Sequence, residues 1–395
     1  MSAPRCVVIG TGRLAGGFVA PLLRDAGWEV VLAGRDQAVI TAINRHGGIR
    51  VRCVGPSPLE RWIDRVRGIN VADPGLAEAI AGADLVATSV GPSALVSVGQ
   101  VLAPLLEARL AQSRGPLNVI AFENHRRSSE LLATGLLDVA PALAPAIGGR
   151  LGVAGSAAWS VATRREVTPE GVRFDVDGEL ECYADRGSLV PGVAPLDGSL
   201  PGIELVRPFA PRIVEKLWVF NAGHAAAAYL GWSHGCATVD EAMAHPAVRA
   251  VVASVVSQAQ QAFLASFPSE PGGMRIPARS LESILDRYAD PALGDPVVRV
   301  AREPRRKLAS GDRLIGPAVA CLGAGIPLSG LAVAAAAALA YAEASDAQAV
   351  DLQQELALLG PEEVLSMVST LDPREELTRL IAQAYAERAV SGVAG

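Results

Sequence analysis

Lysine is almost absent from this 395-residue chain, which has only Lys216 and Lys307 beside 33 arginines. Acidic residues outnumber basic ones by 41 to 35, so the formal net charge is −6. This balance argues against general binding to nucleic acid or to an anionic membrane surface. Because half of the residues are hydrophobic and 19% are charged, the composition also excludes a disordered chain.

The chain has little of what disulfide-bonded, zinc-binding or exported proteins need. Its five cysteines form no CxxC pair and are odd in number: Cys6, Cys53, Cys182, Cys236 and Cys321. Scattered cysteines of this kind argue against a disulfide framework and a zinc ribbon, and they fit a reducing cytoplasm. The opening MSAPRCVVIGTG lacks the basic start and the long apolar stretch of a signal peptide. We therefore expect a cytoplasmic protein without a metal site.

The only candidate for a membrane span is Leu314–Ala342, which carries no charged side chain. Gly316-Pro317 and the segment Gly323–Pro327 interrupt it. Such breaks favour two buried helices over one membrane-spanning helix. We expect no membrane association.

The first third of the chain alternates strands and helices. Apolar, strand-like segments lie at residues 5–10, 29–34, 84–90 and 117–122, and helical patterns lie between them, as at 14–26 and 37–45. This order predicts a parallel sheet with right-handed crossovers.

The pattern changes further along the chain. Near residues 161–200 short strand-like pieces alternate with Gly and Pro, whereas beyond Pro208 nearly every segment has helical periodicity. We therefore expect an α/β Rossmann-type domain with a parallel sheet at residues 1–200, including a β-rich extension near 161–200. An all-helical substrate and catalytic domain is expected at residues 201–395.

The loop after the first strand carries a dinucleotide-binding motif. The chain there reads GxGxxA: Gly10, Thr11, Gly12, Arg13, Leu14 and Ala15. Two glycines permit a tight turn and close approach of the backbone to a pyrophosphate, and a small third residue lets helix and strand pack closely. The helix N-terminus then faces the anion. Gly-rich turns are common, but this position between strand and helix favours dinucleotide binding.

The end of the second strand indicates which dinucleotide binds. An acidic residue there suits the ribose 2′-hydroxyl of NAD, whereas an arginine accommodates the 2′-phosphate of NADP. Here Gly34 stands where a carboxylate is usual, and Arg35 offers a planar cation. We favour NADP. NAD remains open because Asp36 follows, and Arg35 has the alternative of being an ordinary solvated loop residue.

A helix with very few polar side chains carries the candidate catalytic groups. Between Val214 and Trp232 the strongly polar residues are Glu215, Lys216, Asn221 and His224. At 100° per residue, Asn221 lies about 140° from Lys216 and His224 about 80°, so all three can reach one cleft. Alcohol oxidation needs a base, and a buried lysine can have a lowered pKa, whereas arginine cannot deprotonate. Asn221 and His224 are candidates to orient the substrate oxygen.

These residues make the chain resemble the long-chain mannitol (polyol) dehydrogenase family, and within it the mannitol-1-phosphate 5-dehydrogenases. The similarity runs over essentially the whole chain. It includes GTGRLAGGF at the start, ADLVATSVGP, NVIAFENHRRSSELL, EKLWVFNAGHAAAAYLG and REPRRKLASGDRLIGP. The Lys-x4-Asn-x2-His motif is the specific part of the match.

The resemblance implies a metal-independent oxidoreductase that transfers hydride between a nicotinamide and a polyol or sugar, such as mannitol 1-phosphate or fructose 6-phosphate. It implies Lys216 as general acid/base, with Asn221 and His224 as oxyanion and orienting groups. Asn124, from a strand-end Glu-Asn pair, is implied to assist. Glu123 and the Val90-Gly91 turn are implied on the cofactor side, and a monomer is expected.

Five cations lie within twelve residues of this acidic chain: Arg302, Arg305, Arg306, Lys307 and Arg313. Arg302 and Arg306 are one helical turn apart and able to share a face. We interpret Arg302, Arg306, Lys307 and Arg313 as a clamp for a substrate phosphate or carboxylate. The alternative is a solvated basic helix end.

Two departures from the family pattern bear on the substrate. The family's usual Val-Asp-Arg-Ile segment is replaced around Ala158–Val161, and its usual Asp is replaced by Gly34. A hexuronate reductase and a 2-keto or hydroxyacid reductase of the same superfamily therefore remain alternatives. A redox-silent NADP-binding regulator is a further one, from a different functional class.

Overall fold

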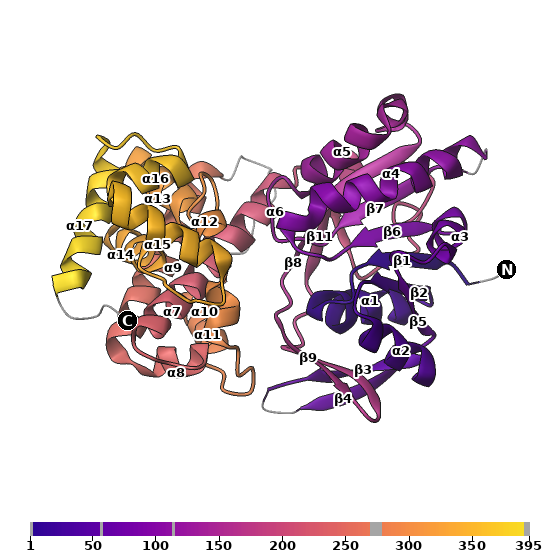
Figure 1. Cartoon of the computed structure of the whole chain (residues 1–395), viewed down its shortest axis with the longest axis horizontal. Helices are drawn as coiled ribbons and strands as arrows, with labels where there is room; N and C mark the ends of the chain where they lie inside the picture. Colours follow the sequence, from indigo (N-terminus) through magenta and orange to yellow (C-terminus); the bar gives the residue numbers. More distant parts are fainter. Residues whose placement is uncertain (1–2, 56–57, 113–114, 269–278, 391–395) are drawn as a thin grey trace. The chain divides into compact units, whose positions relative to one another are not determined.

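The computed structural model describes residues 3–55, 58–112, 115–268 and 279–390. The chain forms two compact units, Met1–Ile213 and Val214–Gly395 (Figure 1). The sequence placed the boundary near residue 200. The first unit runs on to 213 because strand β12, Glu204–Val206, belongs to its main sheet.

Eight strands form the main sheet of the first unit, in the order β12-β11-β8-β7-β6-β1-β2-β5. Their bounds are β1 Arg5–Ile9, β2 Glu29–Gly34, β5 Val66–Asn70, β6 Leu85–Thr88, β7 Leu117–Ala121, β8 Leu151–Ala158, β11 Cys182–Asp185 and β12 Glu204–Val206. The six strands from β5 to β8 are all parallel, and their order is that of the doubly wound dinucleotide fold. The predicted Rossmann-type domain is thus confirmed. The sheet as a whole is mixed, because β11 runs antiparallel to β8.

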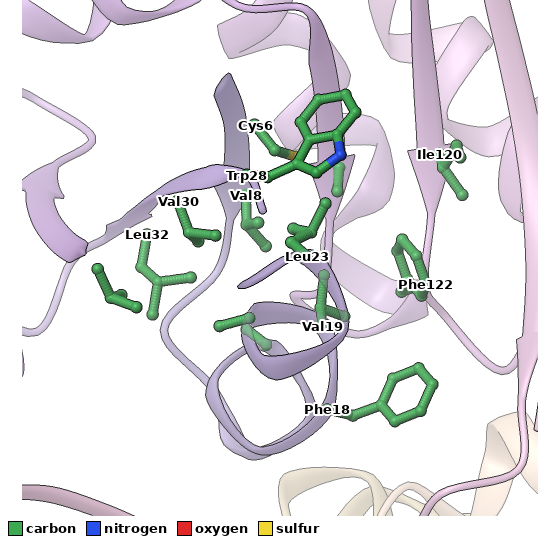
Figure 2. Close-up of a cluster of buried hydrophobic side chains, with 14 of the residues drawn as sticks. Cys6, Val8, Phe18, Val19, Leu23, Trp28, Val30, Leu32, Ile120 and Phe122 are labelled. Atoms are coloured by element: carbon green, nitrogen blue, oxygen red, sulfur yellow. The ribbon is translucent and has the colours of Figure 1, made fainter. Parts of the chain in front are cut away.

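Helices cover both faces of this sheet, because its strands are apolar on both sides. Their bounds are α1 Ala20–Asp25, preceded by a π-helical turn at Ala15–Val19, then α2 Gln37–His46, α3 Gly75–Ala81, α4 Leu95–Ala111 and α5 Ser128–Val139. A further helix, α6 Ala210–Glu215, follows the last strand of the sheet in the chain. On β1, Cys6 and Val8 face α1 and α2, and Val7 and Ile9 face α3, α4 and α5. Figure 2 shows the hydrophobic cluster on the α1 and α2 side of the sheet, where Trp28 and side chains of the helices surround the strand residues.

A second, four-stranded sheet has the order β4-β3-β10-β9. Its strands are β3 Gly48–Cys53, β4 Leu59–Asp64, β9 Ala162–Thr168 and β10 Gly171–Val176. Residues 161–200 are therefore β-rich, but their strands divide between two sheets. Two glycines of the first helical segment permit close packing here, since a Cβ on Gly16 would lie 2.2 Å from Phe174 and one on Gly17 2.5 Å from Val176.

Every regular element in the described part of the second unit is a helix, as predicted. The helices are a π-helical turn Lys216–Phe220, α7 Asn221–Ser233, α8 Val239–Ala244, α9 Pro246–Ser266, α10 Leu281–Tyr288, α11 Val297–Ala301, α12 Pro304–Lys307, α13 Ile315–Gly323, α14 Ser329–Leu339, α15 Ala347–Leu359, α16 Pro361–Ser369 and α17 Glu376–Val390. α7 packs against α8, α9, α11 and α14, and nearly all of its side chains are buried.

The apolar stretch at residues 314–342 forms two helices, α13 and α14, as predicted. The sequence reasoning missed a different segment, Pro92–Ala111, which is long and apolar enough to cross a membrane by length and composition. In the first unit this segment contains α4. Its Leu102, Ala103 and Leu106 are fully buried in the cluster on one face of the sheet.

Candidate active site

The turn after β1 lies where strand order reverses in the main sheet, between β1 and β6. Ligands of open α/β sheets bind outside the carboxyl ends of strands at this point. Gly10 has φ +138°, and a Cβ on it would lie 2.3 Å from the carbonyl oxygen of Ser89 at the end of β6. Glycine is therefore the residue that this turn requires.

The rest of the GxGxxA segment starts the first helix. Thr11 is buried, and Gly12 accepts a backbone hydrogen bond from Gly16 at 3.1 Å. Arg13 is half-buried, Leu14 packs against the core, and Ala15 is fully buried. A Cβ on Gly12 would have only one neighbour within 4 Å, the Ser89 carbonyl oxygen at 3.7 Å. Open space thus lies over Gly12, where the motif requires close approach of a pyrophosphate.

Gly34 ends β2 in contact with this turn. A Cβ on Gly34 would lie 2.5 Å from Thr11 Cγ2 and 2.6 Å from Thr11 Oγ1. The missing carboxylate therefore has a steric cause that the sequence reasoning did not consider, since any side chain at position 34 would overlap Thr11.

The three charged groups beside Gly34 have different environments. Arg35 is exposed and forms no ion pair or hydrogen bond with any residue that the structure describes. Asp36 caps α2, accepting a hydrogen bond from the Val39 N–H at 3.3 Å. It also pairs with Arg165 of β9 at 2.8 Å, and the same guanidinium donates to the Thr11 carbonyl at 3.1 Å. Asp36 therefore already has two partners, and Arg165 is a cation at this turn that sequence reasoning missed.

The second turn at this edge follows β6. Gly91 has φ +98°, and a Cβ there would meet nothing within 4 Å. The buried carboxylate of Glu123 holds the turn from below: it accepts from the Val90 N–H at 2.9 Å and from the Thr88 hydroxyl at 2.7 Å. Burial raises the pKa of Glu123 to about 7, although these hydrogen bonds and one from the Gly91 N–H oppose the shift.

Asn124 follows directly and is half-buried. Its side chain has no hydrogen-bond partner within the described ranges. A primary amide with spare donors and an acceptor at the carboxyl end of β7 is therefore available to a ligand.

The candidate catalytic residues of the second unit lie on a helical run in which a π-helical turn, Lys216–Phe220, stands between α6 and α7. The backbone N–H of Asn221 donates to the carbonyl of Lys216, five residues earlier. This spacing corrects the angle derived from an ideal α-helix. Asn221 lies one full turn beyond Lys216, on the same face, and not about 140° away.

Lys216 and Asn221 are both deeply buried. Lys216 is 1% exposed, and its Nζ lies 4.1 Å from the centre of the Phe220 ring. The side-chain Nδ2 of Asn221 has no hydrogen-bond partner among the described residues. A buried amide donor without a partner is costly in a fold and points to a ligand atom.

His224 lies one helical turn further on, and its Nε2 is 3.2 Å from Oδ2 of Asp295. The ring stacks on Tyr288, with centroids 5.4 Å apart and an interplanar angle of 4°. Gly223 makes room for this stack, because a Cβ on it would lie 2.9 Å from the Tyr288 hydroxyl. Burial lowers the pKa of His224, although Asp295 opposes the shift.

The cation cluster at residues 302–313 is largely paired within the second unit. Its ion pairs are Arg305–Glu355 at 2.5 Å, Arg306–Glu303 at 2.8 Å and Arg313–Asp312 at 2.8 Å. Lys307 is buried and donates to the Arg302 carbonyl, and burial beside Arg306 and Arg313 lowers its pKa well below the usual range. The Arg302 guanidinium is exposed and has no hydrogen-bond or ion-pair partner within the described ranges. Of the four residues expected to clamp a substrate anion, Arg302 is therefore the one whose side chain is not already bonded within the described ranges.

The segment that departs from the family pattern is the end of β8. Ala158 and Trp159 are 3% and 0% exposed, so apolar side chains fill this position in the core of the first unit. Within the described ranges, no three His, Cys, Asp or Glu side chains come together as a possible metal site.

Two family models match this chain. Residues 4–147 match the mannitol dehydrogenase Rossmann domain, and residues 206–388 match the mannitol dehydrogenase C-terminal domain. The chain belongs to the mannitol dehydrogenase family. It is therefore an oxidoreductase that acts on a CH–OH group, as expected, and it takes a nicotinamide cofactor.

Curated members of the mannitol dehydrogenase family resemble the chain over nearly its whole length. A mannitol-1-phosphate 5-dehydrogenase of Brevibacillus brevis is 33% identical, covering 94% of this chain and 96% of its own. One of Geobacillus thermodenitrificans is 32% identical, covering 96% and 98%. Among solved structures, mannitol 2-dehydrogenase of Pseudomonas fluorescens, in a ternary complex with NAD and D-mannitol, superposes with a TM-score of 0.79 at 13% identity. That match covers 99% of this chain and 93% of the other. It supports the same fold.

Proposed function

We propose that this protein is an NADP-preferring dehydrogenase that interconverts a phosphorylated polyol and the corresponding ketose phosphate, with Lys216 as general acid/base. The single observation that carries the proposal is the buried face formed by the π-helical turn Lys216–Phe220 and the start of α7. It presents one amine, Lys216, and one unpartnered amide donor, Asn221 Nδ2, a full turn apart. An amine that exchanges a proton and a donor for an oxygen are the two groups that carbonyl reduction requires.

The nicotinamide cofactor, when bound, supplies or accepts the hydride. Glycines at both turns of the sheet edge fit this group, because carbons added at Gly12 or Gly91 would project into open space. Glu123 fixes the second turn, and Asn124 offers it a free amide. The NADP preference rests on Arg35, which is exposed and unpartnered, and on Asp36, whose carboxylate is already bonded to Arg165.

The proton is held by chain residues alone. In reduction, Lys216 Nζ donates a proton to the developing alkoxide, which accepts a hydrogen bond from Asn221 Nδ2. In oxidation, neutral Lys216 removes the hydroxyl proton as hydride leaves the carbon. Arginine cannot perform this step because its guanidinium stays protonated, which gives a physical reason for lysine in a chain that otherwise uses arginine.

The phosphorylated substrate rests on the names of the relatives and on Arg302, whose guanidinium is exposed and unpartnered. We further propose that the protein is a cytoplasmic monomer, as its sequence suggests.

The test is a panel of fructose 6-phosphate, free fructose and a hexuronate with NADPH and NADH. The proposal requires NADPH oxidation to be fastest with the ketose phosphate. K216A should abolish turnover and leave cofactor affinity within about twofold, and small primary amines should partly restore turnover. K216M, which keeps most of the side-chain volume, separates loss of the amine from loss of packing. Turnover near the wild-type rate in both variants would refute the role of Lys216.

A further inference from the structure

Asp295 lies between His224 and Arg299 in the second unit. Its Oδ2 lies 3.2 Å from His224 Nε2, and its Oδ1 accepts from Arg299 Nε at 2.5 Å. Arg299 Nη2 also donates to Oδ2, so the guanidinium binds both carboxylate oxygens. Asp295 is 3% exposed, and its backbone is held as well, since its carbonyl accepts from the Val239 N–H at 2.9 Å.

This environment fixes the charge of the carboxylate. Burial raises the pKa of Asp295, but the charge of Arg299 and hydrogen bonds from His224 and Arg299 more than offset it and lower the pKa to about 2. An ionised carboxylate only accepts hydrogen bonds. The nitrogen facing it, His224 Nε2, must therefore carry the proton.

The position of this proton determines the state of the other ring nitrogen, His224 Nδ1. Burial lowers the pKa of His224, so the imidazole is neutral near pH 7 and carries a single N–H. With that hydrogen on Nε2, Nδ1 holds a lone pair and acts as an acceptor. No residue in the described ranges bonds to Nδ1. Stacking on Tyr288, whose hydroxyl donates to the Phe220 carbonyl at 2.5 Å, fixes the plane of the ring, and the contact of Nε2 with Asp295 at 3.2 Å fixes its orientation in that plane.

Two side chains of α7 thus have unused hydrogen-bonding capacity, one as a donor and the other as an acceptor. Asn221 Nδ2 is a buried donor without a partner, and His224 Nδ1 is an acceptor without one. They are three residues apart in the helix and so share a face. A donor beside an acceptor is complementary to a carbonyl oxygen beside a hydroxyl group, as in an α-hydroxyketone.

We infer that Asp295, held by Arg299, locks His224 in the Nε2–H tautomer, and that His224 Nδ1 accepts a hydrogen bond from a substrate hydroxyl on the carbon next to the reacting carbonyl. Asp295 is a positioning residue in this arrangement, because it acts only through His224. The inference rests on the proposed carbonyl reduction and adds that a hydroxyl group next to the reacting carbon contributes to substrate binding.

The first test is direct and needs no activity. Nitrogen-15 NMR of histidine-labelled protein, with H224A used to assign the resonance, should give His224 as neutral at pH 7 with the proton on Nε2. A proton on Nδ1 in the wild-type protein would overturn the inference.

The second test uses fructose 6-phosphate and its analogues that lack the C1 or the C3 hydroxyl. In the wild type, one deoxy analogue should have kcat/KM lower by about ten- to a hundredfold, the usual effect of leaving a buried polar group unpaired. H224A should lower kcat/KM for fructose 6-phosphate by a similar factor and leave that analogue nearly unaffected. D295N should act in the same way, and adding it to H224A should cause no further loss.

Two controls separate positioning from general damage. H224N places an amide oxygen close to where Nδ1 stood, so it should recover part of the hydroxyl preference and no longer respond to D295N. D286N changes a mostly exposed acid of α10 and should leave kinetics unchanged. A D295N loss that is equal for hydroxy and deoxy substrates, or additive with H224A, would contradict the inference. If no ketose phosphate reacts at all, the proposed function and the substrate contact of His224 Nδ1 fail together, and the tautomer measurement still decides whether Asp295 holds His224 in the Nε2–H form.

Discussion

The backbone N–H of Asn221 bonds to the carbonyl of Lys216, five residues before it, and not to the residue four before it. This single π-helical turn matches the Lys-x4-Asn spacing, since residues five apart superpose only when the helix is widened locally. In an uninterrupted α-helix the two side chains would point in widely different directions. The turn therefore brings the proposed proton carrier and the proposed oxygen donor onto one face.

The unpartnered Asn221 amide predicts a conflict between stability and activity. Replacing Asn221 by Leu, which is branched at the same Cγ, removes a buried donor without a partner, so the free energy of unfolding should stay the same or rise by about 1 kcal/mol. The kcat should fall about 10²- to 10³-fold, because an oxyanion donor is lost. Urea unfolding and steady-state kinetics test the two halves. A variant that is less stable by several kcal/mol would mean that Asn221 has a structural partner instead.

The sequence singled out these residues as candidates but did not predict their geometry. A long apolar helix with four polar side chains was enough to select Lys216, Asn221 and His224. The π-helical turn was not predictable, because a hydrophobic helix has no polar periodicity in which an extra residue would appear. Asp295 was out of reach for a different reason: it lies 71 positions beyond His224, in a loop without a recognised motif.

Gly34 predicts that NAD specificity cannot be installed by one substitution. G34D would place its Cβ 2.5 Å from Thr11 Cγ2, and it would also bury a new charge. We expect G34D to be destabilised by about 1–3 kcal/mol and to bind neither cofactor well. The double variant T11A/G34D relieves the overlap and should bind NADH better than G34D does. T11A alone serves as the control, and equal behaviour of G34D and T11A/G34D would rule out the steric explanation.

Arg35 predicts a selective loss of NADPH affinity. Because its guanidinium is free of internal partners, R35A should weaken NADPH binding by about 1–2 kcal/mol and leave NADH nearly unchanged. Fluorescence titration with both cofactors measures this difference. R164A, which removes an exposed arginine of β9, is the matched control. Equal losses for the two cofactors would reject a 2′-phosphate contact.

The different environments of the two charged residues after Gly34 could not be predicted from the sequence. Arg35 and Asp36 are adjacent in the chain, and both were candidates for the ribose. Only the fold brings Arg165, 129 residues after Asp36, onto that carboxylate. An ion pair between a helix cap and a strand of another sheet has no local sequence pattern.

Glu123 predicts a pH dependence of stability. Its pKa is about 7 in the folded protein against an ordinary value of 4.5, so folding favours the protonated form. Its contribution is fully present below about pH 4.5 and is lost as the pH rises through about 7, a change of about 3 kcal/mol. E123Q cannot ionise and should lack this loss, while showing a constant offset from the changed bond to the Val90 N–H. Urea unfolding of both proteins from pH 4.5 to 8 gives the difference, and parallel curves would be inconsistent with a raised pKa.

The exposed guanidinium of Arg302 leads to a prediction of which residue in the cation cluster contacts a substrate phosphate. The sequence counted five charges, but the structure gives Arg305, Arg306 and Arg313 carboxylate partners and leaves the Arg302 guanidinium exposed. R302A should therefore raise KM for fructose 6-phosphate about tenfold and leave kcat and the KM for free fructose nearly unchanged. R305A breaks the pair with Glu355 and should lower thermal stability slightly, since a half-buried ion pair contributes little to stability. It should not raise KM, because this guanidinium is already held by a carboxylate. The opposite pattern, with KM raised by R305A and not by R302A, would mean that the ion pair opens to receive the phosphate.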